Sequence, residues 1–243
     1  MNIALIGYGK MGRAIDEIIS QSDIHQIVSR SFADKNGLDL EGIQKADVAI
    51  DFTSPEIVMD TMRQVIPLGI PLVVGTTGWQ DHLSEVEGLV TEHKNGLIYG
   101  GNFSIGVNVF FNMVAYASKL LAQFDGYDVS GVETHHVHKK DSPSGTARQL
   151  ADTIMKNYPS KTMLQTEKLD RQIKPEELHF ASVRSGRNVG EHEITFDSAA
   201  DEIRLAHKAW NRRGFAEGSL VAAEYIRHKK GMYNFADIFT ELR

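Results

Sequence analysis

The chain begins with an apolar run that leads directly into a glycine-rich turn. Ile3 to Ile6 have the composition of a buried strand, Gly7-Tyr8-Gly9-Lys10-Met11-Gly12 follows at once, and a helical pattern starts at Arg13. In this order the first glycine permits a tight turn, the second lets the backbone approach a pyrophosphate, and the third allows the helix to pack closely on the strand. The segment predicts a dinucleotide-binding unit. The alternative is a glycine turn that holds no ligand.

Strand-like runs alternate with helix-like segments over the first hundred residues. The strand candidates are Ile3 to Ile6, Gln26 to Val28, Val48 to Asp51, Leu72 to Val74 and Leu97 to Tyr99. The helix candidates are Met11 to Ser20, Pro55 to Ile66 and Gln80 to His93. This alternation predicts an α/β fold with a Rossmann-like, doubly wound parallel sheet.

Two polar motifs end strand candidates of this sheet. They are Asp51-Phe52-Thr53 and Gly75-Thr76-Thr77-Gly78. Such sheets bind ligands in the crevice outside the carboxyl ends of their strands, so we expect Gly75, Thr76 and Thr77 to contact the cofactor. The alternative is purely local, because Ser54-Pro55 can start a helix and Gly75 to Gly78 can form a turn.

The end of the second strand candidate bears on the choice between the two nicotinamide cofactors. An acidic residue that hydrogen-bonds the ribose 2′-OH of NADH is expected about 20 residues after the glycine motif. Here the run continues into Ser29-Arg30-Ser31, with no carboxylate to repel a 2′-phosphate and with a guanidinium able to pair with it. We expect Arg30 to contact the ribose and the chain to prefer NADPH.

A second domain is expected from residue 106 to residue 213. From Ser104 to Phe124 apolar residues recur with helical spacing, which predicts a long helix that leaves the first domain. The remaining candidates are strands over Asp128 to His138, Leu178 to Arg184, Glu191 to Phe196 and Glu202 to His207, a helix over Thr146 to Tyr158, and a loop from Pro159 to Pro175. This pattern predicts an α+β domain with a mixed open sheet. A last helix candidate, Phe215 to Arg227, lies in the segment 214–243.

Proton-transfer side chains stand directly before a predicted helix start in the segment from Glu133 to Ala147, which reads Glu-Thr-His-His-Val-His-Lys-Lys-Asp-Ser-Pro-Ser-Gly-Thr-Ala. Histidines exchange protons near neutral pH, and lysines are cationic donors. The turn that opens the helix leaves free N–H groups and the positive end of a dipole, both of which attract an anion. We therefore expect an active site for a small carboxylate.

Two other interpretations of this segment stay open. On a strand, His136 and His138 would share a face and could bind a metal together with His135. Zinc needs three or four well-placed ligands with supporting contacts, and no HExxH motif or matching cluster occurs elsewhere, so we expect no metal. The second interpretation is a solvated charge cluster on a loop.

Composition limits the partners of the chain. The formal net charge is −6 and consecutive basic residues form nothing longer than pairs, which argues against a nucleic-acid partner. The absence of cysteine excludes disulfides, thiolate catalysis and cysteine metal sites. Met1 is followed at once by a strand candidate and no apolar run is long enough to cross a bilayer, so we expect a cytoplasmic protein with no signal peptide and no membrane partner.

Together these motifs resemble the 4-hydroxy-tetrahydrodipicolinate reductase family, formerly called dihydrodipicolinate reductase, of the diaminopimelate and lysine pathway. The resemblance covers almost the whole chain, and the histidine-lysine to Pro-Ser-Gly-Thr segment is its most specific part. Further matching segments are Asp51-Phe52-Thr53, Gly75-Thr76-Thr77-Gly78, Asn102-Phe103-Ser104-Ile105-Gly106-Val107-Asn108, Arg184-Ser185-Gly186 and Gly190-Glu191-His192. The chain departs from the family at Ser130, where a glutamate is frequent, at Val137, where an arginine is common, and at Gly100-Gly101, where Ala or Pro is usual.

The resemblance implies reduction of 4-hydroxy-tetrahydrodipicolinate to tetrahydrodipicolinate and water by NADPH or NADH. It implies that His135 gives or takes a proton, that Lys139 donates one, and that His136 binds substrate. Gly145 and Thr146 would hold a substrate carboxylate, and the implied cofactor contacts include Gly100, Gly101, Asn102 and Phe103. The resemblance also implies that residues 214–243 return to the cofactor domain 1–105, and that a homotetramer forms through the second sheet.

Two other functions would use the same features. One is an NAD(P)-dependent dehydrogenase of another small amino or imino acid, similar to aspartate dehydrogenase. The other is a non-catalytic sensor that binds nicotinamide, in which the histidine-lysine segment would be inert.

Overall fold

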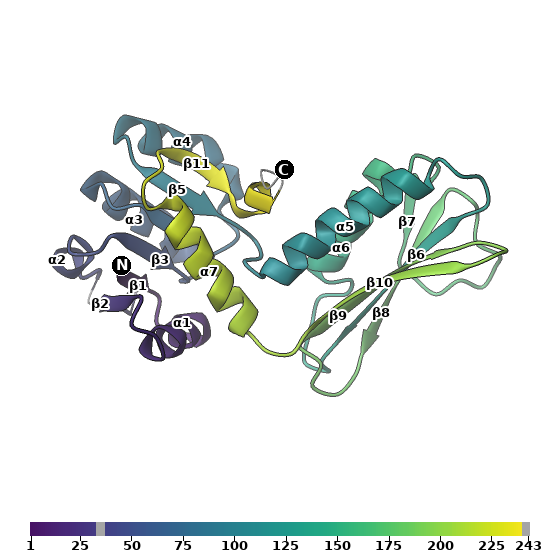
Figure 1. Cartoon of the computed structure of the whole chain (residues 1–243), viewed down its shortest axis with the longest axis horizontal. Helices are drawn as coiled ribbons and strands as arrows, with labels where there is room; N and C mark the ends of the chain where they lie inside the picture. The colour runs from purple at the N-terminus through teal and green to yellow at the C-terminus, as the bar shows by residue number, and fades with distance from the viewer. Residues whose placement is uncertain (33–36, 240–243) are drawn as a thin grey trace. The chain divides into compact units, whose positions relative to one another are not determined.

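The computed structural model describes residues 1–32 and 37–239, which divide into two compact units (Figure 1). Unit 1 consists of Met1–Ile105 and Arg212–Arg243, and unit 2 consists of Gly106–Asn211. Within the described ranges, none of the helices is both long enough and apolar enough to cross a membrane.

Unit 1 is built on a six-stranded parallel sheet with the strand order β11-β5-β4-β3-β1-β2. The strands are β1 (Asn2–Ile6), β2 (Gln26–Ser31), β3 (Val48–Asp51), β4 (Leu72–Val74), β5 (Gly96–Tyr99) and β11 (Gly231–Asn234). The winding direction reverses between β1 and β3, so the carboxyl ends of these two strands border the crevice where such sheets bind ligands.

Helices cover both faces of this sheet, as Figure 1 shows. The helices of unit 1 are α1 (Lys10–Ser20), α2 (Leu40–Ile43), α3 (Pro55–Val65), α4 (Leu83–Glu92) and α7 (Arg213–Ile226), with short 3-10 segments at Ile66–Leu68, Gln80–His82 and Phe235–Phe239. One core contains α2, α3 and α4 with Ala4 and Ile6 of β1, and the other contains α1 and α7 with Ile3 and Leu5. Successive residues of β1 therefore enter opposite cores, which explains why the strand is apolar throughout.

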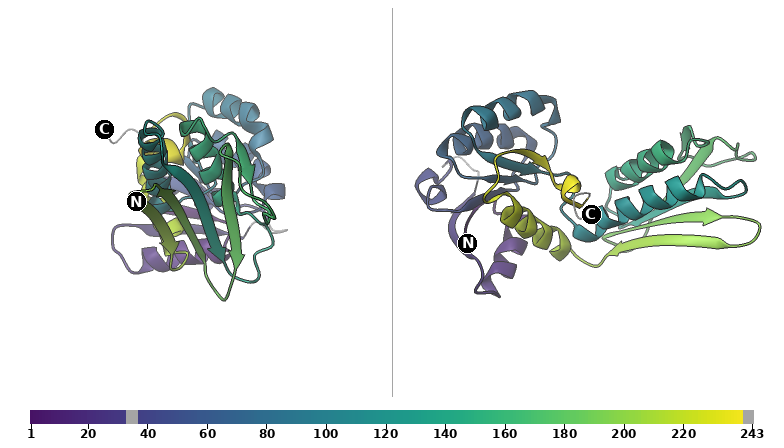
Figure 2. Two further views of the ribbon diagram at one scale, coloured as in Figure 1. Left: turned by 90° about the vertical axis from the view of Figure 1, so that its right-hand side faces the viewer. Right: turned by 45° about the horizontal axis from the view of Figure 1, so that its top comes forward.

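Unit 2 contains a five-stranded mixed sheet with the order β10-β9-β6-β8-β7. Its strands are β6 (Asp128–His135), β7 (Met163–Gln165), β8 (Glu177–Arg184), β9 (Gly190–Asp197) and β10 (Glu202–Ala209). β6 pairs parallel with β8 and antiparallel with β9. Helices α5 (Ile105–Leu121) and α6 (Gly145–Asn157) pack in one core with the inward residues of the sheet (Figure 2). On the outward face, Val132 and Val183 are exposed.

The predicted fold class is confirmed, and most predicted elements agree with the structure to within a few residues. The short elements that were not predicted include the single-turn helix α2, the edge strand β7 inside the expected loop, β11, and the 3-10 segment Phe235–Phe239. β2 is longer than expected, so that Arg30 lies within the strand.

The expected strand Asp128 to His138 is wrong at its end, because β6 stops at His135. A turn follows, in which the Lys139 N–H donates to the carbonyl of His136 at 3.1 Å. His136, His138 and Lys140 therefore lie beyond the strand, and the expectation that strand alternation places 136 and 138 on one face does not hold.

Candidate active site

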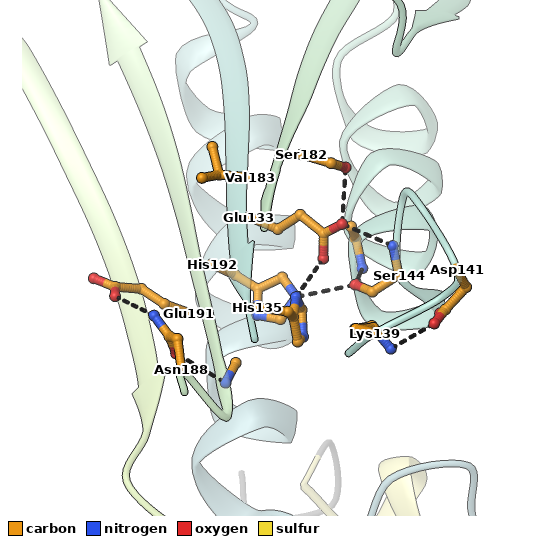
Figure 3. A network of polar contacts seen from close by, with 12 residues as sticks. Glu133, His135, Lys139, Asp141, Ser144, Ser182, Val183, Asn188, Glu191 and His192 are labelled. Atoms are coloured by element: carbon orange, nitrogen blue, oxygen red, sulfur yellow. Dashed lines mark hydrogen bonds and ion pairs between the residues drawn. The ribbon is translucent and has the colours of Figure 1, made fainter. Parts of the chain in front are cut away.

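The carboxylate of Glu133 lies fully buried on the inward face of β6 (Figure 3). Its Oε1 accepts hydrogen bonds from the Ser144 N–H at 2.9 Å, Ser182 Oγ at 2.8 Å and Arg184 Nη2 at 2.9 Å. Burial alone would raise the pKa of Glu133, but the close contact with His135 and the hydrogen bonds from Ser144, Ser182 and Arg184 hold it well below its usual range. Glu133 is therefore a permanent negative charge at neutral pH.

His135 stands beside this carboxylate, two residues further along β6. Its Nδ1 lies 2.8 Å from Glu133 Oε2, although neither atom has a hydrogen-bond partner of regular geometry among the described residues. The contact is therefore electrostatic, and a small rotation of the ring would align it. A Cβ at position 190 would lie 3.0 Å from His135 Nε2, so Gly190 leaves room at the second ring nitrogen. The carboxylate favours a proton on Nδ1 and leaves Nε2 for proton exchange.

His192 of β9 closes the other side of this cluster. Its Nε2 lies 3.3 Å from Ser144 Oγ and 3.8 Å from Glu133 Oε2, and its ring meets that of His135 edge-on. Burial lowers the pKa of His192 to about 4, with a further contribution from the charge of His135. His192 is therefore neutral at physiological pH.

Glu133, His135 and His192 offer ligand atoms within 4.8 Å of one another, which is close enough for a metal ion. Arg184 Nη2 already lies 2.9 Å from Glu133 Oε1, however, and its guanidinium balances the carboxylate charge. A cation in this cluster would be repelled by Arg184, so the arrangement favours proton transfer over metal binding.

Lys139 lies in the loop between β6 and α6 and is only partly exposed. Its Nζ lies 2.9 Å from Asp141 Oδ1. The neighbouring Lys140 is exposed, as are Val137 and His138, whereas His136 is partly buried. Of the two lysines, Lys139 is therefore the one held within the site.

The start of α6 is where the sequence predicted that an anion would bind. Ser144 is the N-cap, and its Oγ accepts a hydrogen bond from the Ala147 N–H at 3.1 Å. In the part of the chain that the structure describes, the N–H groups of Gly145 and Thr146 have no protein acceptor. Two backbone donors are thus available to one carboxylate at the positive end of the helix.

The glycine loop of unit 1 has the predicted geometry. Gly7 has φ +87°, which confirms the tight turn, and a Cβ at Gly12 would lie 2.4 Å from the Gly7 carbonyl oxygen, which confirms the close packing of helix on strand. A Cβ at Gly9 would meet nothing within 4 Å. No side chain among the described residues caps the start of α1. The open space and uncapped N–H groups fit the pyrophosphate of a nicotinamide dinucleotide.

A cavity of about 410 Å³ adjoins this loop. It is lined by Gly9, Lys10, Met11, Phe52, Thr53, Pro55, Gly75, Thr76 and Thr77. The two polar motifs predicted to face a ligand therefore meet the glycine loop around one cavity.

The fully buried Asp51 supports this lining from behind. Its Oδ1 accepts a hydrogen bond from Thr76 Oγ1 at 2.7 Å, and Thr76 Oγ1 in turn accepts one from the Thr53 N–H at 2.8 Å. Burial raises the pKa of Asp51 to about 6, and the neutral donors offset this only in part.

The four predicted cofactor residues after β5 differ in accessibility. Gly101 is exposed and Asn102 is partly buried, while Gly100 is buried. The Phe103 side chain is also buried, and its ring packs 4.6 Å from that of Phe235 between ring centroids. Any cofactor contact of Phe103 would therefore come from its backbone.

Arg30 lies beside a carboxylate, contrary to the prediction from the sequence. No carboxylate was expected beside it, but Asp16 of α1 lies against it, with Arg30 Nε 2.8 Å from Oδ2 and Nη2 2.9 Å from Oδ1. Tyr8 of the glycine loop donates a hydrogen bond from its hydroxyl to the same Asp16. The carboxylate beside Arg30 thus belongs to helix α1 and not to the end of β2, which is where the sequence motif places such a residue.

All predicted cofactor residues lie in unit 1, and the predicted catalytic and substrate residues lie in unit 2. Glu133, Ser182, His192 and Asp16 were not among the predicted site residues. For Glu133 a signal was available, because it shares the inward face of β6 with His135. The strand register places Ser182 and His192 on either side of it.

Comparison with known proteins decides the family. Residues 1–103 match the family described as dihydrodipicolinate reductase, N-terminus, and residues 106–239 match dihydrodipicolinate reductase, C-terminus. The chain belongs to the dihydrodipicolinate reductase family. Its resemblance to this family is thereby confirmed, and the chain is an NAD(P)H-dependent oxidoreductase.

Individual members of the dihydrodipicolinate reductase family align over nearly the whole chain. The 4-hydroxy-tetrahydrodipicolinate reductase of Christiangramia forsetii is 37% identical over 242 residues, which cover 100% of this chain and 99% of the relative. That of Staphylococcus carnosus is 34% identical and covers 98% of this chain and 99% of its own length. A solved dipicolinate-bound dihydrodipicolinate reductase from Paenisporosarcina sp. TG-14 shares the fold, with a TM-score of 0.79 and 23% identity over 98% of this chain and 99% of that one.

Proposed function

We propose that the chain reduces 4-hydroxy-tetrahydrodipicolinate to tetrahydrodipicolinate in the diaminopimelate and lysine pathway. The overall change takes up one hydride and one proton, and the hydroxyl group leaves as water. The observation that carries the proposal is the placement of His135, Lys139 and two backbone N–H groups around the start of α6, in a chain that belongs to this family. Among the described residues, neither N–H group has a protein acceptor.

NADPH or NADH, when bound, supplies the hydride. The glycine loop and the uncapped start of α1 would hold the pyrophosphate, and Gly75, Thr76 and Thr77 would border it. Asp51 keeps Thr76 in place through its hydrogen bond at 2.7 Å.

The substrate is a dicarboxylate, and the loop before α6 offers groups that suit it. The N–H groups of Gly145 and Thr146 would donate to one carboxylate, and the Thr146 hydroxyl can donate a third hydrogen bond. Lys139 adds a positive charge, and His136 is a further substrate contact. Backbone donors at a helix start give such a site a fixed geometry that costs no reorganisation when substrate binds.

The proton would come from Lys139 Nζ, with His135 as a second donor or acceptor. Glu133 orients the His135 ring through Nδ1, so that Nε2 remains the exchanging nitrogen. Arg184, Ser182 and the Ser144 N–H hold Glu133 in place. Glu133 therefore acts through His135 as a positioning residue.

We also infer a homo-oligomer, a tetramer in keeping with the family, and a cytoplasmic location in keeping with the pathway. The outward face of the unit 2 sheet, with Val132 and Val183 exposed, supports assembly through this sheet. Light scattering of the purified chain would measure the mass of the assembly, and a monomeric mass would contradict the inference.

The reaction is tested by following NADPH and NADH absorbance while dihydrodipicolinate synthase generates the substrate. We expect oxidation of the nicotinamide only when the synthase and both of its substrates are present. Oxidation that instead requires an amino or imino acid unrelated to this pathway would favour the aspartate dehydrogenase-like alternative. Cofactor binding without turnover of any such substrate would favour the sensor.

The placement of the substrate carboxylate has its own test. Pyridine-2,6-dicarboxylate is a planar dicarboxylate, and we expect it to inhibit competitively with substrate. Thr146→Val should weaken this inhibition several-fold, because the valine cannot donate a hydrogen bond. An unchanged inhibition constant would remove Thr146 from the site.

A further inference from the structure

The ion pair between Asp16 and Arg30 lies where the sequence predicts contact with the cofactor ribose. We propose that Asp16 is a specificity-determining residue, which weakens the preference for NADPH that Arg30 alone would give. The inference rests on the proposed function, because it concerns the nicotinamide cofactor of that reaction.

Geometry makes Asp16 a strong competitor for the Arg30 guanidinium. Both Asp16 oxygens are engaged, one by Nε at 2.8 Å and the other by Nη2 at 2.9 Å. This parallel pair of hydrogen bonds is also the arrangement in which a guanidinium binds phosphate. A 2′-phosphate that approaches Arg30 from this side must therefore displace Asp16 or share the donors with it.

The negative charge of Asp16 also opposes the binding of a 2′-phosphate at Arg30. The hydrogen bond from Arg30 holds the pKa of Asp16 below its usual range, so Asp16 is ionised at neutral pH. Only 15% of the Asp16 side chain is exposed, against 43% for Arg30, so the negative charge is poorly screened by solvent. A dianionic 2′-phosphate next to Arg30 would be repelled by Asp16, whereas a neutral 2′-hydroxyl could donate a hydrogen bond to it.

Tyr8 ties this pair to the loop that would hold the cofactor. Its hydroxyl donates to Asp16 Oδ2, and this hydrogen bond raises the pKa of the Tyr8 phenol, which therefore stays protonated. The Arg30 guanidinium lies 6.0 Å from the Tyr8 ring centroid, and the Phe32 ring meets Tyr8 edge-on. Asp16 is thus fixed from α1, β2 and the glycine loop together, and it cannot leave Arg30 without losing two partners.

A different role for Asp16 gives the opposite result. If Asp16 only holds Arg30 in the orientation that binds a 2′-phosphate, its removal would weaken NADPH binding. The two roles therefore differ in the sign of the change in NADPH affinity, which makes them separable in one variant.

The test is Asp16→Asn, which keeps the size of the side chain and removes its charge. We expect NADPH and the fragment 2′,5′-ADP to bind about ten-fold more tightly, because one charge-assisted competitor is removed. NADH and 5′-AMP, which lack the 2′-phosphate, should bind equally well or more weakly. Dissociation constants come from nicotinamide fluorescence and, for the fragments, from calorimetry.

Two controls accompany the variant. Glu17→Gln removes the same charge from an exposed neighbour on the same helix and should leave the NADPH to NADH ratio unchanged. In an Arg30→Met background the ion pair is absent, so Asp16→Asn should no longer raise the affinity for 2′,5′-ADP. A double-mutant cycle measures this coupling between Asp16 and Arg30. Thermal unfolding of each variant shows whether the fold is retained.

Weaker NADPH binding in Asp16→Asn, or an unchanged NADPH to NADH ratio, would overturn the inference. Failure of the wild-type chain to bind either nicotinamide would instead contradict the proposed function. If Asp16→Asn does not fold, Asp16→Ser is measured with the same ligands and the same expected signs.

Discussion

Asp51 in unit 1 and Glu133 in unit 2 are both fully buried carboxylates, and their pKa values shift in opposite directions. The donors closest to Asp51 are neutral hydroxyl and backbone groups, and burial raises its pKa to about 6. Glu133 has the Arg184 guanidinium at 2.9 Å and the His135 ring at 2.8 Å in addition to neutral donors, and its pKa is lowered. Burial alone therefore does not decide whether a carboxyl group is charged; the number and the charge of its hydrogen-bonding partners decide as well.

The opposite pKa shifts indicate different roles for Asp51 and Glu133. Asp51 accepts hydrogen bonds and holds Thr76 and Thr53 at the edge of the cavity in unit 1. Glu133 carries a fixed charge that polarises His135 in unit 2. We therefore expect variants of the Glu133 cluster to affect chemistry, and variants of Asp51 to affect mainly the pH dependence of stability.

The largest effect is expected from the cation of the unit 2 site. A positioned general acid contributes roughly 10² to 10⁴ in rate, so Lys139→Met should lower kcat by about that factor. NADPH binding should stay near the wild-type value, because the glycine loop belongs to the other unit. Steady-state kinetics and fluorescence titration separate the two quantities.

Lys140→Met is the matched control for Lys139. Lys140 is exposed whereas Lys139 is partly covered and paired with Asp141, so its loss should cost little. If Lys140 proves essential and Lys139 dispensable, the assignment of Lys139 as the proton donor is reversed. Proton transfer would then not be assigned to the Glu133 cluster.

A smaller but still large effect is expected for Glu133→Gln. The amide keeps the shape, but it leaves the Arg184 charge, which is only 20% exposed, without its partner. Breaking such a pair costs about 3 kcal/mol in unfolding free energy. The pH dependence of kcat should shift as well, because His135 loses the adjacent negative charge.

Urea unfolding measures the loss of stability in Glu133→Gln, and the pH profile of kcat measures the change in chemistry. A shift in stability with an unaltered pH profile would leave Glu133 a purely structural role.

The smallest effect is expected for Asp51→Asn, and it concerns pH. The folded pKa of about 6 lies above the ordinary value of 3.8, so the folded state binds the proton more tightly than the unfolded chain does. The stabilisation from Asp51 is therefore fully present below about pH 4 and is lost as the pH rises through 6. Relative to Asp51→Asn, the wild-type chain should lose on the order of 1–3 kcal/mol of stability over this range.

Glu133 should show no such change over most of the same range. Its folded pKa is lowered, so its contribution is present above the ordinary value of 4.5 and is lost only as the pH falls below it. Urea unfolding at several pH values measures both differences. If the free energy of unfolding changes with pH equally in the Asp51 and Glu133 variants, the hydrogen-bonding partners do not determine the pKa values of the two carboxyl groups.

The elements with strong local signals could be predicted from the sequence. Gly7 and Gly12 predict a tight turn and a helix that starts close to it. The apolar runs predict the bounds of β1, β3 and β4 to within one residue. The end of β6 could not be predicted, because the turn after His135 depends on a hydrogen bond from the Val137 N–H to the carbonyl of Gly186, far along the chain. β7 is a three-residue edge strand that pairs only with β8, which is too short for a periodic signal.

The sequence could nominate site residues where they are consecutive, but not where they are brought together by folding. His135, Lys139 and Thr146 belong to one segment, and their residue types indicated proton transfer and anion binding. Asp16 and Arg30 are 14 residues apart on a helix and a strand, and their pairing depends on how α1 is rotated against β2. The predicted absence of a carboxylate near Arg30 failed for this reason.

The sheet pairing around Glu133 also has a consequence for how unit 2 folds. The three donors to Glu133 Oε1 are 11, 49 and 51 residues away along the chain, on the start of α6 and on β8. Contacts of such high sequence separation form late, because long loops must close before the contacts can stabilise the structure. A partly folded unit 2 without β8 would have to bury this carboxylate without the charge of Arg184 or leave it in water, which disfavours such an intermediate. We therefore expect the recovery of Lys139-dependent activity after dilution from denaturant to require the pairing of β6 with β8.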